Sequence, residues 1–136
     1  MSKTHPLVIE AEVRAKYNDV NGTNASKQRL ILPGGHAQHE FDLVDRGILI
    51  GGISTSPWRT GSGRNWNTGG QDRAASELFW LSLLDGPARR IHILTDEEMA
   101  QKLFSRYGQI PMRAPIDIHH YSVLRSEFSL VGTLGV

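Results

Sequence analysis

Two contrasting hydrophobic patterns joined by a tight turn constrain the fold of this chain most strongly. Residues 39–44, HEFDLV, alternate in polarity with Phe41 and Leu43 on one face, and a period of two predicts a β-strand. The segment DRG at 45–47 favours a tight turn. Residues 48–55, ILIGGIST, then form a nearly continuous apolar run, which predicts a central strand buried on both faces. Other elements must therefore cover both faces of its sheet.

The remaining segments alternate between helical and strand patterns. Ile9, Val13 and Tyr17 recur at four-residue spacing, which predicts a helix, and Thr95 with Glu98 fits a capping box at the start of another. In chain order we expect a helix over 6–18, a short strand in 28–33, the hairpin at 39–55, a helix over 71–84, a strand at 89–94, a helix from 95 to 107, and strands at 116–123 and 127–132. This order predicts one mixed α/β domain over residues 1–136, with a central sheet flanked by helices.

Composition limits the class of protein. The chain of 136 residues has no cysteine, which excludes disulfides and thiolate metal sites and suits a reducing compartment. No segment approaches the ~20 apolar residues of a spanning helix. The opening MSKTHPLVIEAEVR carries charge inside its apolar stretch and lacks a small-residue cleavage signature, which argues against a signal peptide. We therefore predict a cytoplasmic protein without a membrane partner. A net charge of +1 means that any electrostatic footprint for nucleic acid is local.

The order helix, hairpin with an acid on its first strand, helix, strand, helix resembles the restriction-endonuclease-like PD-(D/E)xK nuclease superfamily over residues 7–121. In that family's pattern an Asp lies on or just before one hairpin strand, and a Glu-x-Lys, often preceded by Gly, follows on the next. Asp42 in HEFDLV matches the first acid. In ILIGGISTS, however, Gly52 stands where the Glu would fall and Ser54 where the Lys would fall. The twin glycines also fit a bulge or the close approach of a packed helix.

The resemblance implies phosphodiester cleavage that depends on Mg2+ or Mn2+, with Asp42 as a metal ligand. One carboxylate offers too few hard ligands for a tight Mg2+ site, so further groups are needed. Glu12 on the first helix and Glu77 on the helix after the hairpin are candidates, as acids on neighbouring helices serve this purpose in some members. Gln71 is a further candidate to position the ion or a phosphate, because it begins the buried stripe of the 71–84 helix and some exonuclease-like members carry a Gln there.

Each candidate also has a purely structural interpretation. Asp42 could be a solvated or paired acid on the polar face of a strand, and Gln71 could satisfy the end of a helix. Arg73 and Glu77 lie four residues apart, a spacing typical of a surface ion pair. Glu12 could equally face solvent. The histidines at 36, 39, 119 and 120 are interpreted as structural or surface residues, because no zinc spacing is present.

The loop SPWRTGSGRNWNTGGQDR at 56–73 has the composition of a binding segment. Arginines contact phosphates, tryptophans can stack on exposed bases, and the end of the loop leads into a helix N-terminus that favours anions. It is neither a Walker A loop nor a dinucleotide fingerprint. The alternative is a mobile surface hairpin whose tryptophans pack down. The candidate nucleic-acid-binding residues are Trp58, Arg59, Arg64, Trp66 and Arg73.

Three hypotheses follow for the function. The first is a nucleic-acid-binding protein of the nuclease superfamily with a divergent active site. The second is a catalytically inactive nuclease-like fold that acts as a structural or regulatory binding module. The third is a small-molecule binding domain that uses the 56–73 loop as a lid. In addition, the strand expected at 127–132 would leave an exposed edge, which predicts pairing across a two-fold axis in a homodimer.

Overall fold

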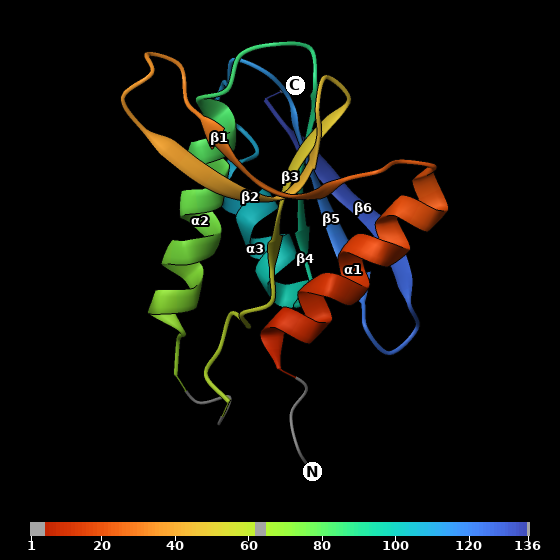
Figure 1. The fold of residues 1–136 in the computed structure, drawn as a ribbon. Coiled ribbons are helices and arrows are strands. Elements are labelled where there is room, and N and C mark those ends of the chain that lie inside the picture. The colour runs from red at the N-terminus through yellow and green to blue at the C-terminus, as the bar shows by residue number, and fades with distance from the viewer. Residues whose placement is uncertain (1–4, 62–64, 136) are drawn as a thin grey trace.

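The computed structural model describes residues 5–61 and 65–135, which form a single α/β domain (Figure 1). Each expected helix and strand is present, with bounds that differ by a few residues. Within the described ranges, no helix has the length and apolar character needed to cross a bilayer. The elements in chain order are α1 (Pro6–Asn21), β1 (Ser26–Ile31), β2 (Gln38–Asp45), β3 (Leu49–Ser54), α2 (Thr68–Ser82), β4 (Arg89–Leu94), α3 (Glu97–Tyr107), β5 (Ile116–Ser122) and β6 (Glu127–Leu134).

The strands form one six-stranded mixed sheet in the order β1-β2-β3-β4-β5-β6. The pairs β3–β4 and β4–β5 are parallel, whereas the other three pairs are antiparallel. Parallel neighbours need a crossover connection, and α2 and α3 supply the two crossovers. Strand β6 is an edge of the sheet, as expected, and its use in a homodimer stays a prediction.

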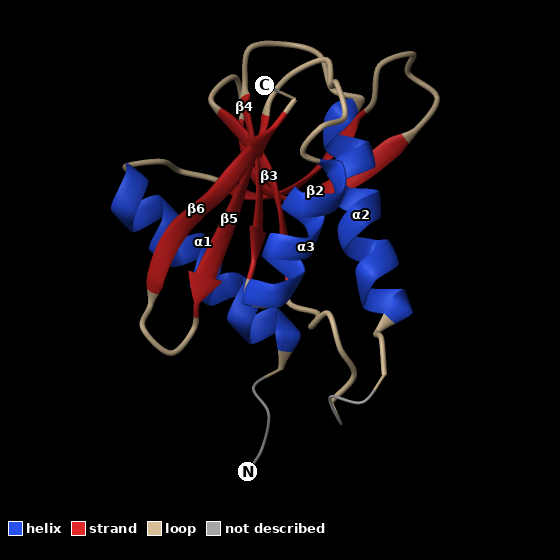
Figure 2. Ribbon diagram, turned by 180° about the vertical axis from the view of Figure 1, so that it is seen from behind, coloured by secondary structure: helices blue, strands red, loops and turns tan. Residues whose placement is uncertain are grey.

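The helices cover the two faces of the sheet unequally. Figures 1 and 2 show α1 on one face and α2 with α3 on the other. Val13 and Tyr17 of α1 pack with Ile91 and Ile93 of β4 in one buried cluster. A second buried cluster joins the apolar sides of α2 and α3 to the opposite face of the strands. The sheet is thus buried on both sides, as the apolar run of the hairpin predicts.

Strand β3 lies at the centre of this arrangement. All of its residues from Leu49 to Ile53 are buried, which confirms the prediction of a strand covered on both faces. Gly51 is required by the packing, because a Cβ there would lie 2.9 Å from the carbonyl oxygen of Ile91 and 2.6 Å from its Cγ1. Gly51 therefore marks a close approach of neighbouring strands, whereas Gly52, which lies against Glu77 of α2, fits the expected close approach of a packed helix.

Strand β2 departs from regular alternation. Ser26 pairs with Val44 and Gln28 pairs with Phe41, so two steps along β1 correspond to three along β2. This extra residue is a β-bulge, which re-aims the side chains that follow it. Phe41 consequently packs in the cluster on the α2–α3 face, while Leu43 packs in the cluster on the α1 face. The expectation that these two residues share a face was wrong, because polarity does not reveal the pairing register.

The cap of α3 also differs from the expectation. Asp96 is the N-cap residue, and its Oδ2 accepts a hydrogen bond from the backbone N–H of Met99 at 2.9 Å. Thr95 instead continues the pairing of the sheet, since its N–H donates to the carbonyl oxygen of Ser54. The capping box with Thr95 as its first residue was therefore wrong by one position. The same Asp96 oxygen also accepts the N–H of Trp58, which ties the loop after β3 to α3.

We expect Gly51→Ala to destabilise the protein, because its Cβ would force apart the backbones of β3 and β4. Overpacking of this kind costs about 1–3 kcal/mol. Gly69→Ala is the matched control, because a Cβ there would meet Arg73 Nη1 at 3.4 Å, an ordinary contact with the end of a flexible side chain. Thermal unfolding should show a melting temperature lowered by several degrees for the first variant and nearly unchanged for the second. Equal melting temperatures would mean that the strands can separate at no cost.

Candidate functional site

The carboxylates of Glu10 and Glu77 each act on that of Asp42 where α1, β2 and α2 meet, and we refer to these three residues as the acid cluster. The charges of both glutamates bear on Asp42 and raise its pKa. They come from helices on opposite faces of the sheet. The cluster brings together two of the predicted catalytic residues, Asp42 and Glu77, with an acid that the sequence did not single out.

A local separation of strands makes this meeting feasible. The pairing of β2 with β3 ends at Leu43 and Gly51, and the two strands have no ladder partners beyond that point. Asp42 Oδ2 accepts a hydrogen bond of 2.8 Å from the Ile53 N–H, in place of a backbone partner. The carbonyl oxygen of Asp42 accepts another at 2.8 Å from Arg14 Nε on α1. The carboxylate is thus held by β3, and the backbone of Asp42 is held by α1.

Glu77 reaches the cluster through the space left by Gly52. A Cβ on residue 52 would overlap Glu77 Cγ and lie 2.7 Å from its Oε1. The carboxylate of Glu77 therefore occupies the volume in which a side chain of residue 52 would begin. Its Oε2 lies 3.1 Å from His39 Nε2, and the His39 ring stacks on Trp80 with 4.8 Å between centroids. Its Oε1 is buried and has no hydrogen-bond partner in the described part of the chain.

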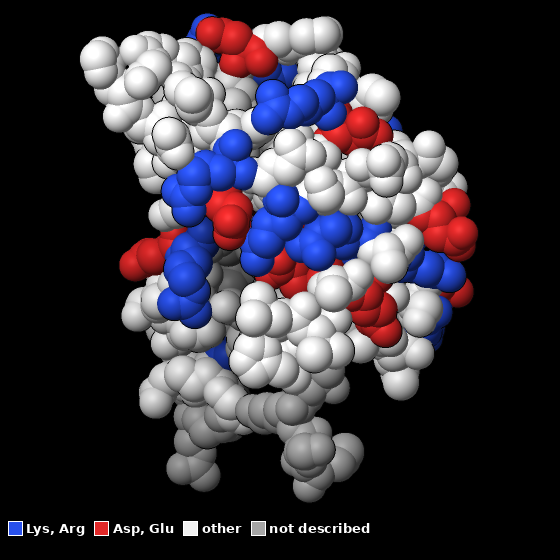
Figure 3. Space-filling view, in the orientation of Figure 1, with Lys and Arg blue, Asp and Glu red and all other residues white. Residues whose placement is uncertain are grey.

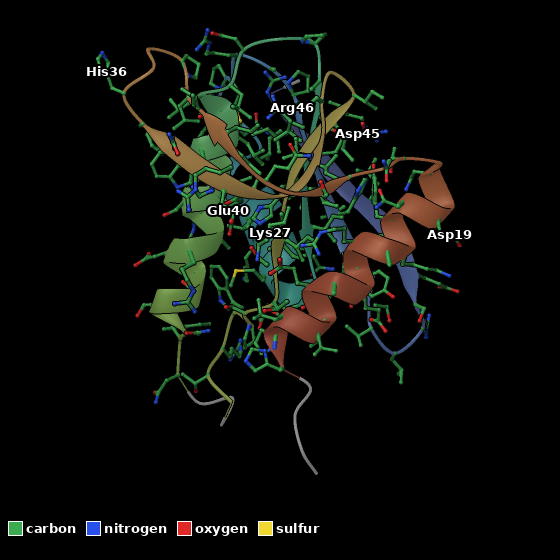
Figure 4. All side chains as sticks on the ribbon, in the orientation of Figure 1. Asp19, Lys27, His36, Glu40, Asp45 and Arg46 are labelled. Atoms are coloured by element: carbon green, nitrogen blue, oxygen red, sulfur yellow. The ribbon has the colours of Figure 1, made fainter. Side chains whose placement is uncertain are left out.

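Glu10 forms ion pairs with two cationic side chains. Its Oε1 lies 2.8 Å from Arg14 Nη2 and 3.0 Å from Lys27 Nζ. Lys27 also lies 3.9 Å from Glu40, and Figure 4 shows these two labelled residues on the neighbouring strands β1 and β2. Lys and Arg side chains gather around acidic ones on this face of the molecule (Figure 3). The acid cluster is therefore bordered by cations.

Burial governs the protonation of the cluster. The pKa of Asp42 is raised to about 7; desolvation is the largest cause, the hydrogen bond from the Ile53 N–H opposes the rise, and the nearby Glu10 and Glu77 add to it. Desolvation alone raises the pKa of Glu77 to about 7. The pKa of His39 is lowered, chiefly by burial. The pKa of Lys27 is raised, first by its hydrogen bond to Glu10. Two neighbouring acids thus titrate near neutral pH, a feature typical of functional sites.

The donors of this cluster fit a hard divalent cation in their chemistry. Carboxylate oxygens are the ligands that Mg2+ and Mn2+ prefer, and the unpartnered Oε1 of Glu77 is a buried acceptor that lacks a donor. Over residues 5–61 and 65–135, however, no three His, Asp or Glu side chains converge closely enough to hold one metal ion. The carboxylates therefore approach one another without forming a closed shell of ligands.

A polar pocket of about 190 Å3 opens beside Glu77. It lies between the end of β3 and the first turns of α2. Arg73 borders this pocket and donates to Ser56 Oγ at 3.2 Å, while Glu77 contacts His39. The surface ion pair expected from the four-residue spacing of Arg73 and Glu77 was therefore wrong. The lining residues are Ile53, Ser54, Thr55, Ser56, Gly70, Arg73 and Glu77.

The other two catalytic candidates lie elsewhere. Glu12 is exposed on α1, and Glu10 is the α1 acid that influences Asp42. Gln71 donates from Nε2 to the carbonyl oxygen of Trp58 at 2.9 Å, so it holds the loop before α2 in place. A signal for Glu10 was present in the sequence, because Glu10 precedes Val13 by three residues and Tyr17 by seven, which places it beside the buried stripe. Sequence reasoning gave no role to Lys27, and interpreted His39 as structural.

Two described segments before α2 pair with each other. Arg59 and Trp66 form an antiparallel bridge, and the Thr60 N–H donates to the Asn65 carbonyl oxygen. Trp58 is only 4% exposed, so its predicted role as an open stacking platform was wrong, whereas Trp66 is 58% exposed. Arg59 forms two hydrogen bonds with Glu98, at 3.0 and 3.3 Å. Arg64 lies outside the described residues.

Comparisons with known proteins add no relative. No protein-family model matches the chain, and neither a curated protein nor a solved structure matches it significantly. The interpretation of the site therefore rests on its own geometry and chemistry.

The raised pKa values predict an unusual dependence of stability on pH. Asp42 and Glu77 titrate near pH 7 in the folded chain and near 4 when unfolded, so the free energy of unfolding falls as pH rises from about 4 to 7. Asp42→Asn and Glu77→Gln remove this dependence. We expect each variant to gain about 2 kcal/mol relative to the natural chain between pH 5 and pH 8. Thermal unfolding at the two pH values measures the gain.

The matched control for this measurement is Glu12→Gln, which makes the same chemical change on the exposed side of α1. Its melting temperature should follow that of the natural chain at both pH values. If Asp42→Asn and Glu77→Gln also followed the natural chain, the two carboxylates would be ionised and well solvated, in contradiction to the burial described above.

Proposed function

We propose that this chain is a nucleic-acid-binding protein of the PD-(D/E)xK nuclease superfamily that cleaves phosphodiester bonds at the acid cluster. The observation that carries the proposal is the position of Glu77. The resemblance leaves Gly52 where the family has a Glu, and the carboxylate of Glu77 fills the space in which a side chain of residue 52 would begin. A carboxylate thus stands beside Asp42, although it comes from α2 and not from β3.

The arrangement of the elements supports the same proposal. Asp42 lies on the first strand of the β2–β3 hairpin, and α2 follows and leads into β4, which pairs parallel with β3. This is the order helix, hairpin, helix, strand that underlies the resemblance. Ser54, where the family has its Lys, lies on β3 and borders the pocket next to Glu77.

The proposed cofactor is Mg2+ or Mn2+, for which Asp42, Glu77 and Glu10 are the candidate ligands. Such an ion neutralises the charge that develops on a phosphate and lowers the pKa of its bound water. Lys27 supplies the cation that the second half of the motif lacks, because Glu10 holds its ammonium group 3.0 Å away at the edge of the cluster. In that place it can orient a phosphate oxygen. Arg73, which borders the pocket, offers a second contact for the nucleic-acid backbone.

A second function is favoured by one specific observation. No three acidic or histidine side chains converge on a single point within the described ranges, and a serine replaces the motif's lysine. An inactive nuclease-like fold that binds a partner would have these properties. The two functions make different predictions about divalent cations.

If the chain is a metal-dependent nuclease, Mn2+ or Mg2+ at millimolar concentration should raise its melting temperature by several degrees. A ligand at 100 times its dissociation constant stabilises the folded state by about 2.7 kcal/mol. We expect the same ions to support cutting of a labelled DNA that has duplex and single-stranded regions. Both effects should disappear in Asp42→Asn and Glu77→Gln and persist in Glu12→Gln. Absence of both effects in the natural chain would favour the binding module.

Moving the carboxylate from residue 77 to residue 52 tests whether the two positions present it to the same place. Gly52→Ala alone should destabilise the chain, because its Cβ overlaps Glu77, and this cost should largely disappear when Glu77 is also alanine. We expect Glu77→Ala to lose the metal-induced rise in melting temperature, and the pair Gly52→Glu with Glu77→Ala to regain part of it. A folded double variant without any metal response would show that the two positions do not present a carboxylate to the same place.

A further inference from the structure

We propose that a pocket between the bridged residues Arg59 and Trp66 and α3 binds one nucleotide of a single-stranded nucleic acid. We call it the Trp66 pocket; its volume is about 350 Å3, and it is lined by Trp58, Trp66, Thr68, Gln71, Lys102 and Arg106. This inference rests on the proposed function and specifies its substrate, a strand with unpaired bases. Lys102 and Arg106 have no role in the analysis of the sequence.

An aromatic wall forms one side of the Trp66 pocket. The exposed Trp66 ring stands edge-to-face against the buried Trp58 ring, with 6.3 Å between centroids and 73° between planes. The bridge between Arg59 and Trp66 fixes the backbone under the exposed indole, and the Arg59 guanidinium lies 4.8 Å from its ring centroid. An indole ordered in advance loses little conformational entropy when a base stacks on it. Base stacking on aromatic side chains contributes about 1–3 kcal/mol per base.

Two cations of α3 line the same pocket beside the tryptophans. Lys102 and Arg106 lie one turn apart on α3, and the Arg106 guanidinium is 5.0 Å from the centroid of the Trp58 ring. Neither residue forms an ion pair with an acid in the described part of the chain, whereas Arg59 is neutralised by Glu98. The uncompensated positive charge of the pocket therefore comes from α3. A positive charge and an exposed indole in one pocket suit a base and the phosphate attached to it.

The location of the pocket links it to the acid cluster. Thr68 and Gln71 line the Trp66 pocket, and Gly70 and Arg73 line the polar pocket that contains Glu77. Both pockets thus share the first turns of α2. Gln71 and Glu77 are six residues apart, or about 9 Å along the helix axis. A strand held at Trp66 can therefore continue past Arg73 to the carboxylates.

The stacking wall selects an unpaired base. In a duplex both faces of each base are covered by neighbouring base pairs, so a base reaches an indole only when it is unstacked or extruded. The Trp66 pocket is an open, shallow site with an exposed indole, which suits the face of a splayed base better than the backbone of an intact helix. The geometry points to a single strand or a frayed end as the substrate.

Binding of a labelled 12-nucleotide oligo-dT in EDTA, followed by fluorescence anisotropy, tests this inference without catalysis. We expect the natural chain to bind the single strand more tightly than a duplex of the same length. Trp66→Ala should weaken binding by about tenfold through lost stacking, and Lys102→Glu should weaken it through lost charge. Arg125→Glu is the matched control, because it makes the same change of charge at an exposed residue of the β5–β6 turn. Thermal unfolding verifies that each variant is folded.

Several outcomes would overturn the inference. These are absence of binding to the single strand, tighter binding of the duplex, or equal losses in Lys102→Glu and Arg125→Glu. The proposed function fails separately: a chain that binds oligo-dT through Trp66 but never cuts with Mg2+ or Mn2+ would retain the pocket and lose the nuclease. Conversely, a chain whose cutting and binding ignore Trp66 and Lys102 would retain the nuclease and lose the pocket.

Discussion

The burial of β3 on both faces sets the positions of everything else in this domain. Each side chain of the strand must fit against a helix layer or a neighbouring strand, and the two glycines divide this task. Gly51 admits the side chains and backbone of its neighbours Leu43 and Ile91, whereas Gly52 admits a side chain from α2. The first glycine is explained by packing alone. The second opens a space that is filled by a carboxylate, which is the more informative choice because an apolar side chain would fit a core better.

The burial of Asp42 and Glu77 has a free-energy cost that the fold offsets only in part. Asp42 receives one backbone N–H, and Glu77 contacts one imidazole, yet Glu77 Oε1 remains without a partner among the described residues. Stability alone gives no reason to keep two acids whose pKa values rise to about 7. A site that must bind a cation or exchange a proton near neutral pH does give such a reason. The burial of these two carboxylates, one with an oxygen that lacks a described partner, therefore supports the argument from the position of Glu77.

The sequence determined the fold more reliably than the site, for reasons visible in single residues. The continuous apolar run of β3 and the four-residue spacing of α1 depend on burial, which is local to each element. The bulge of β2 depends on its partner strand, so Phe41 and Leu43 could not be assigned to opposite faces from polarity. The prediction of Glu12 in place of Glu10 did not take the direction of the buried stripe of α1 into account. The phase of α1 was readable from Val13 and Tyr17, and it places Glu10 toward the sheet.

A motif that is read along one strand misses groups that other elements supply. Glu77 lies 25 positions after Gly52, but the two share one volume because α2 packs on β3. The same helix continues toward its N-terminus into the wall of the Trp66 pocket. A single rigid element thus carries both an acid of the cluster and part of the surface proposed to hold a base. Because a helix does not stretch, a nucleotide bound at one end is placed at a fixed distance from the carboxylates. In this fold, recognition and chemistry would be coupled through α2, although the residues involved are scattered in the sequence.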